Sequence, residues 1–170
     1  MLVTVRTYPV PARKGIEVSC TGGITSDGKW IRLFPVPYRF LDDDKRFKKY
    51  QWIDVDVTKA QDDPRPESYK LNIEKITTGS LISTNDAWRA RKELVFPLKR
   101  ESLCQIERER QEVGSPTLGI FKPGEIKRLM IKETNHDWSP QQSAILNQQF
   151  FDFANAPQKS LESVRKVHEG

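Results

Sequence analysis

The sequence predicts a mainly β protein, in which a small β-barrel is followed by a helical connector and a second β element. Three observations predict this fold class. Segments of alternating apolar and polar residues recur in the first half of the chain, glycines and prolines separate these segments, and helical patterns interrupt the series in the middle.

The predicted barrel has strands that are recognised by their period of two. Val3 and Val5 share one face of the first strand, and Ile31 and Leu33 share the inward face of the third. The Asp27-Gly28 pair predicts a hairpin turn before the third strand, because both residues tolerate positive φ. The expected strands cover residues 3–6, 16–20, 30–34, 51–57 and 68–76.

Later segments predict the connector and the second element. Asn85 is the expected N-cap of one helix, and Gly114 is expected to close another. Helices are expected at residues 85–95, 102–113 and 141–153, and strands at 117–121 and 125–131. The chain is thus divided into an OB-like barrel over 1–82, a helical connector over 83–114, a second β element with a terminal helix over 115–155 and a polar tail over 156–170.

Composition narrows the class of partner and the compartment. Hydrophobic residues make up 36% of the 170-residue chain and charged residues 30%, and no run approaches the roughly 18 apolar residues of a membrane span. No secretory signal pattern is present, so a cytoplasmic location and no membrane partner are expected. The net charge of +5 and the pI near 9.2 favour a polyanionic partner. Cys20 and Cys104 have no metal or redox spacing and are expected to be free thiols.

No pattern of catalytic residues stands out, so a non-enzymatic role is favoured and no cofactor is expected. Asp54 and Asp56 project to the same side of one strand and could hold a divalent metal, but the polar face of a half-buried strand is the favoured explanation for both. His136 and His168 lie in polar surroundings and cannot complete a zinc site with the two cysteines.

The best candidate for a binding surface is the outer face of the third strand. Alternation places Trp30, Arg32 and Phe34 on that face. Single-strand binding proteins stack bases on aromatic side chains and neutralise phosphates with cations. The alternative is that the connector helices cover Trp30 and Phe34, which would form a secondary core.

Two further clusters extend this candidate interface. Residues 41–50 form a charged segment that is expected to make one or two helical turns anchored by Phe47, and they include Lys48 and Lys49. A proline-flanked loop places Arg65 near Tyr69. The full set of candidate nucleic-acid-binding residues is Trp30, Arg32, Phe34, Arg39, Lys48, Lys49, Arg65 and Tyr69.

Three segments together resemble an uncharacterised bacterial family described as containing two OB folds. They are "TYPVPARKGIEVSCTGGITSDGKWIRLFPVPYRF", "KYQWIDVDVTKAQDDPRPESYKL" and "TLGIFKPGEI". The resemblance covers residues 3–135 and implies an N-terminal OB-like barrel, a helical connector and a second OB-like or β element. The C-terminal end departs from the family pattern, in which a further β-rich segment follows, so the second barrel would be incomplete.

The sequence therefore predicts an OB-type module that binds single-stranded or structured DNA or RNA. The alternative is an accessory subunit that docks a separate enzyme through an exposed apolar patch around Trp30 and Phe34. Fold alone does not decide between them, because OB barrels also bind proteins and sugars. The oligomeric state does not follow from the sequence.

Overall fold

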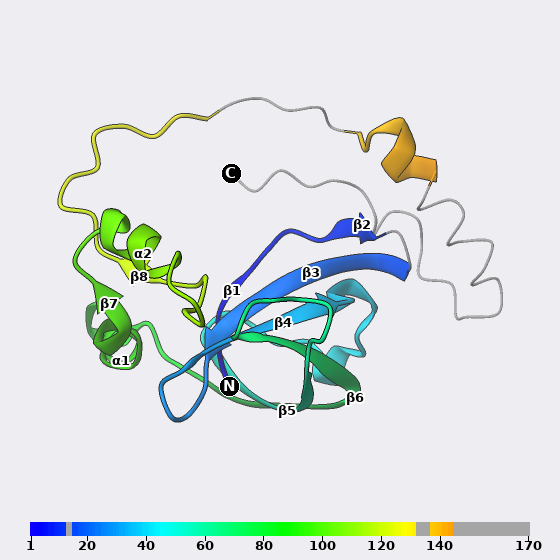
Figure 1. The fold of residues 1–170 in the computed structure, drawn as a ribbon. Coiled ribbons are helices and arrows are strands. Elements are labelled where there is room, and N and C mark those ends of the chain that lie inside the picture. Colours follow the sequence, from blue (N-terminus) through cyan, green and yellow to red (C-terminus); the bar gives the residue numbers. More distant parts are fainter. Residues whose placement is uncertain (13–14, 132–136, 145–170) are drawn as a thin grey trace.

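A computed structural model describes residues 1–12, 15–131 and 137–144 (Figure 1). The main sheet has six strands, and five of them close into a barrel because the first strand pairs with both β3 and β5. These five are β1 (Leu2–Arg6), β3 (Gly15–Ile24), β4 (Trp30–Val36), β5 (Gln51–Lys59) and β6 (Ser68–Leu81). The short strand β2 (Val10–Ala12) pairs with β3 outside the closure.

The order of the strands around the barrel is β1-β3-β4-β6-β5 and back to β1. Only the β4–β6 pair in this barrel is parallel. The protein is therefore mainly β with a closed OB-like barrel, as the sequence predicts. In such barrels the second and third strands and the adjacent loops commonly form the ligand face, which corresponds here to β3 and β4.

The core lies inside this barrel and follows the predicted alternation on β4. On β1 the expected shared face of Val3 and Val5 is wrong, because a register shift between them leaves Val3 buried and Val5 47% exposed. Ile31 and Leu33 on β4 are 7% and 0% exposed, which confirms their inward orientation. Phe47 is completely buried and packs its ring edge against Tyr38, so the predicted anchor of the charged segment is confirmed. That segment forms one 3-10 turn, η2 (Asp43–Lys45), after a first turn, η1 (Tyr38–Phe40).

A bulge changes the pattern on β6. The register pairs Val55 with Ile76 but Val57 with Leu71, so β6 contains extra residues between these two pairs. The period of two predicts that Tyr69, Leu71 and Ile73 point to one side, and for Ile73 this is wrong: Tyr69 and Leu71 pack against the core, whereas Ile73 is exposed and Ile76 is buried. The bulge reverses the direction of the side chains along the rest of the strand.

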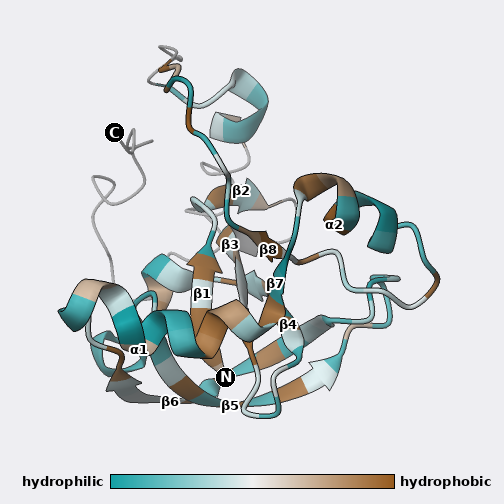
Figure 2. Cartoon of the chain, turned by 90° about the vertical axis from the view of Figure 1, so that its left-hand side faces the viewer, coloured by the Kyte–Doolittle hydropathy of each residue, from teal (hydrophilic) through white to brown (hydrophobic). Residues whose placement is uncertain are grey.

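The connector contains α1 (Asn85–Val95), η3 (Phe96–Leu98) and α2 (Leu103–Glu109). The Ser102 hydroxyl accepts a hydrogen bond from the backbone N–H of Gln105 and caps α2. The predicted cap of α1 is wrong, because Thr84 occupies the N-cap position and makes no side-chain capping bond. Figure 2 shows that α1 carries mainly hydrophilic residues.

The second β element is small. Strand β7 (Lys99–Arg100) pairs in parallel with β8 (Ile120–Phe121), so the predicted strand at 117–121 is represented by two residues. The predicted partner strand at 125–131 does not form. Residues 140–144 are helical, whereas the rest of the predicted terminal helix and the tail over 156–170 lie outside the described residues. None of the helices in the described ranges is long and apolar enough to cross a membrane.

Candidate nucleic-acid interface

The outer face of β4 carries the three residues that the sequence placed there. Phe34 is 38% exposed and Trp30 is half-buried, whereas Arg32 is only 7% exposed. The Arg32 guanidinium lies 4.7 Å from the centre of the Phe34 ring. The face therefore combines one accessible aromatic ring with a cation that solvent hardly reaches.

Arg32 is neutralised within the protein. Its Nη1 donates to Asp63 Oδ2 at 2.9 Å and to Ser68 Oγ at 2.7 Å. The same carboxylate accepts from Arg65 Nε at 2.8 Å and from Arg65 Nη2 at 2.7 Å. The hydrogen bonds from Arg65 first, and then the one from the Ser68 hydroxyl at 2.8 Å, hold the pKa of Asp63 well below its usual range. One carboxylate thus joins two of the predicted cations.

An extended segment of the second element covers part of the same face. Glu67 is 3% exposed, and its Oε1 accepts from the backbone N–H of Thr117 at 2.8 Å. Leu118 lies over Gly22, where a Cβ added to the glycine would meet the Leu118 Cδ1 at 3.4 Å. Gly22 is the register partner of Arg32, so this contact falls on the β3–β4 surface. The cover beside Arg32 is an extended segment, whereas helices were the expected alternative.

Arg39 follows the C-terminal end of β4 and is held by a buried carboxylate. Its Nη1 lies 3.0 Å from Glu17 Oε1, and its Nη2 donates to the Tyr8 hydroxyl at 2.7 Å. Burial raises the pKa of the Glu17 carboxyl, and the Arg39 guanidinium opposes that rise. The arrangement gives Arg39 a structural role in joining η1 to β3.

Tyr69 belongs to the edge of the core. Its half-buried ring packs against the buried cluster inside the barrel. The ammonium of Lys59 lies 5.2 Å from the ring centre and donates to the carbonyls of Arg65, Pro66 and Ser68. Lys59 therefore fixes the loop that carries Arg65.

Lys48 and Lys49 differ from the predicted arginines. Both side chains are exposed, and within the part of the chain that the structure describes neither forms an ion pair. The backbone between them and the barrel is fixed, because the N–H of Tyr50 donates to the Val3 carbonyl at 2.6 Å. The two ammonium groups thus project from an ordered edge into solvent.

Two arginines extend this edge on either side. Arg6 donates to the Phe47 carbonyl at 3.4 Å, and its guanidinium lies 3.4 Å from the centre of the Tyr38 ring. Arg91 lies 4.3 Å from the centre of the Tyr50 ring. We call this surface the basic edge; it consists of Arg6, Tyr38, Lys48, Lys49, Tyr50 and Arg91.

The carboxylates next to the basic edge are largely occupied by their own neighbours. Asp42 pairs with Lys45 at 3.1 Å, and Asp43 pairs with Arg46 at 2.8 Å. Asp44 is the member of this aspartate run for which no ion pair is found in the described ranges. The four cations of the basic edge therefore outnumber the unpaired carboxylates of this aspartate run. Arg32, Arg39 and Arg65, in contrast, each form an ion pair with a carboxylate.

Family comparison divides the chain just after α1. Residues 1–97 match a domain of unknown function (DUF8758), and residues 99–168 match a second one (DUF8757). The chain belongs to the DUF8758 family. No curated protein and no solved structure matches the chain. The DUF8758 unit contains the whole barrel and the basic edge, and the DUF8757 unit supplies the segment that lies over Gly22.

The metal alternative receives no support from the geometry. Asp54 and Asp56 are exposed on β5, and no group of three or more His, Cys, Asp or Glu side chains that could hold a metal occurs among the described residues. His136 and His168 lie outside those residues. Cys20 and Cys104 are free.

Sequence reasoning missed three members of the basic edge, namely Arg6, Tyr38 and Arg91, and placed Tyr50 beside Lys48 and Lys49. Alternation could not reveal the direction of Arg6, because a register shift between Val3 and Val5 leaves Val5 47% exposed and pairs Arg6 with the buried Thr21. Tyr50 has a positive φ of 61°, and the sequence around it gives no indication of this backbone conformation. Arg91 lies 41 positions from Tyr50 along the chain, and only the folded barrel brings α1 to that edge.

Proposed function

We propose that this DUF8758 protein is a non-enzymatic nucleic-acid-binding module whose basic edge contacts the phosphate backbone. The observation that carries the proposal is the set of cations at Arg6, Lys48, Lys49 and Arg91, none of which is joined to a carboxylate in the described part of the chain. Unpaired cations bind phosphates without first breaking an internal ion pair, which favours this surface over the β4 face.

Aromatic side chains organise the two arginines. Tyr38 and Tyr50 each lie under one guanidinium, which restricts the arginine side chain before a ligand arrives. Less side-chain freedom is then lost on binding, so each contact contributes more to affinity. Lys48 and Lys49 directly precede Tyr50 in the chain and continue the positive surface.

The β4 face has a secondary place in this proposal. The exposed ring of Phe34 remains available for stacking, but Arg32 and Arg65 are both paired with Asp63. The OB fold and the bacterial family are also part of the proposal. The strand order supports the OB fold, and the three sequence segments together support the resemblance to the bacterial family. A cytoplasmic location is proposed on the sequence pattern alone.

The direct test is binding of labelled oligonucleotides to the full chain. We expect fluorescence anisotropy at about 50 mM salt to show saturable binding that weakens steeply as salt rises. The variant Lys48→Gln/Lys49→Gln should bind more weakly than the wild type. The absence of binding to both DNA and RNA at low salt would contradict the proposal.

A second candidate is a protein-interaction module, and one surface favours it. Four apolar side chains that follow β8 are strongly exposed, namely Ile126 at 80%, Leu129 at 83%, Met130 at 65% and Ile131 at 83%. Exposed apolar groups in such a run are typical of interaction sites. If this apolar surface is an interaction site, Leu129→Ser should abolish capture of the protein partner, and the affinity for oligonucleotides, which depends on the basic edge, should stay unchanged.

A further inference from the structure

Trp88 extends the basic edge with a layered arrangement of side chains. The Arg91 guanidinium lies 4.3 Å from the centre of the Tyr50 ring and 5.6 Å from the centre of the Trp88 ring. Arg91 also donates from Nε and Nη2 to the Ile82 carbonyl at 3.0 and 2.9 Å, which fixes its position. The order of the layers is therefore Tyr50, Arg91 and Trp88, with Trp88 outermost.

The outermost ring is exposed although it is large and apolar. Trp88 is 53% exposed, so Arg91 and the helix cover only part of it. A tryptophan used only for core packing would be largely buried. The remaining surface of the indole ring is available to a flat partner.

The backbone that displays Trp88 is unusual. Asp86, Ala87 and Trp88 have φ values of 52°, 53° and 65°, so three consecutive residues other than glycine lie in the left-handed region. L-residues rarely adopt this conformation, and strained backbone concentrates at ligand-binding sites. The strain accompanies an exposed aromatic ring, which is the combination expected where a ring must be held out for a ligand.

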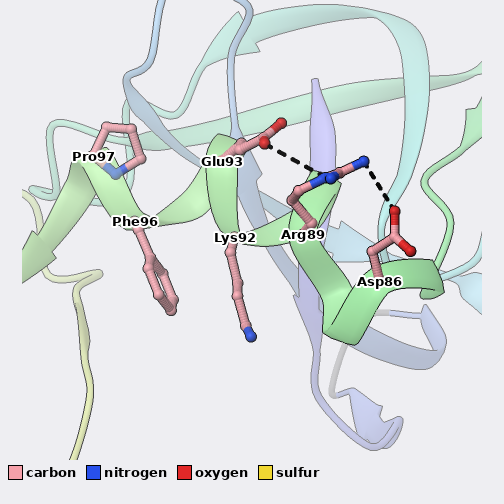
Figure 3. A pocket seen from close by; sticks show the side chains of 6 residues that line it. All are labelled: Asp86, Arg89, Lys92, Glu93, Phe96 and Pro97. Carbon is pink, nitrogen blue, oxygen red and sulfur yellow. Dashed lines mark ion pairs between the residues drawn. The ribbon is translucent and has the colours of Figure 1, made fainter.

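The acidic side chains on the same helix are held by one arginine. Asp86 lies 2.9 Å from Arg89 Nη2, and Glu93 lies 4.0 Å from Arg89 Nε, as Figure 3 shows. Arg89 offsets one of these two charges, and Arg91 and Lys92 on the same helix give α1 a net positive charge beside the open hollow that Phe96 and Pro97 also line. An anionic ligand at Trp88 meets no unpaired carboxylate of α1 in the described structure.

We infer that Trp88 is a base-stacking platform and that the nucleic acid bound is therefore unpaired. This inference rests on the proposed function and specifies its ligand. A base in a single strand can stack on the exposed part of the indole while its phosphates run past Arg91, Lys48 and Lys49. A base in an intact duplex is already stacked on both faces and cannot reach the ring.

The test uses the full chain and three probes of equal length: a DNA single strand, its duplex, and a single strand with abasic sites in place of bases. The wild type should bind the single strand roughly 5- to 150-fold more tightly than the abasic strand, the range expected for one stacked base. Trp88→Leu should lose this preference but keep its affinity for the abasic strand. Trp88→Phe should retain part of the preference, and Phe121→Leu, at a ring on β8 that is 37% exposed, should retain it fully.

The outcomes separate the two proposals. If none of the probes binds at low salt, the proposed function itself fails. If single strand and duplex bind equally, or if Trp88→Leu leaves the preference for bases unchanged, the stacking inference is overturned while the binding function stands. Because Trp88 is exposed, the melting temperature of both Trp88 variants should stay close to that of the wild type, and this checks that the comparison is made on folded protein.

Discussion

The basic edge makes a quantitative prediction about salt. Binding to a single strand releases counterions, and the slope of log K against log salt is about −0.7 for each phosphate neutralised. With four cations at Arg6, Lys48, Lys49 and Arg91, the expected slope is about −2.8. Affinity should then fall by about 50-fold between 50 and 200 mM salt.

Replacing two of these cations should halve the effect. The variant Lys48→Gln/Lys49→Gln is expected to have a slope of about −1.4 and to lose only about sevenfold over the same salt range. Fluorescence anisotropy with one labelled single strand, titrated at four or more salt concentrations, measures both slopes.

A matched control removes two lysines that are already paired. Lys29 lies 2.7 Å from Asp27, and Lys70 lies 3.0 Å from Asp62, and both are exposed. Lys29→Gln/Lys70→Gln changes the net charge by the same amount, but its slope should remain close to that of the wild type. Equal slopes for the two double variants would refute the reasoning, because net charge rather than the basic edge would then govern binding.

Three further predictions concern the interactions beneath the β4 face. Asp63→Asn should lower the free energy of unfolding by about 3 kcal/mol in urea titrations, because Arg32 stays buried without its carboxylate. The pKa of Asp63 is lowered in the folded state, so the ionised carboxylate stabilises the fold at pH values above the unfolded pKa of roughly 4. This contribution is lost as the pH falls below that value. In urea titrations from pH 6 to pH 2, the free energy of unfolding should therefore fall less in Asp63→Asn than in the wild type. Glu67→Gln should loosen the segment that carries Thr117, so the backbone amide of Thr117 should exchange its hydrogen faster. An unchanged exchange rate would contradict the contact between Glu67 and Thr117.

The barrel could be predicted because its signals are local. Alternation placed Ile31 and Leu33 inside, and Asp27-Gly28 marked the hairpin, where Gly28 has a φ of 78°. The β6 bulge could not be predicted, because it depends on the pairing of β6 with β5. The absence of the strand expected at 125–131 has a similar cause. Strand β8 pairs with β7, which precedes α2 in the chain, and not with the residues that follow it.

The candidate site could be predicted only in part. The sequence identified Lys48 and Lys49, but it gave the same weight to Arg32, Arg39 and Arg65. Nothing local shows that Asp63 lies against Arg32, which is 31 positions away, or that Glu17 lies against Arg39. Long-range ion pairs decide which cations are available to a ligand, and these pairs exist only in the folded barrel.

Lysine footprinting tests the central claim most directly. The full chain is treated with an acetylating reagent with and without a saturating single-stranded oligonucleotide, and each lysine is quantified by mass spectrometry. The ligand should protect Lys48 and Lys49 and leave the exposed Lys29 and Lys70 unchanged. Protection of Lys29 and Lys70 with none at Lys48 and Lys49 would contradict the assignment of the basic edge as the nucleic-acid interface.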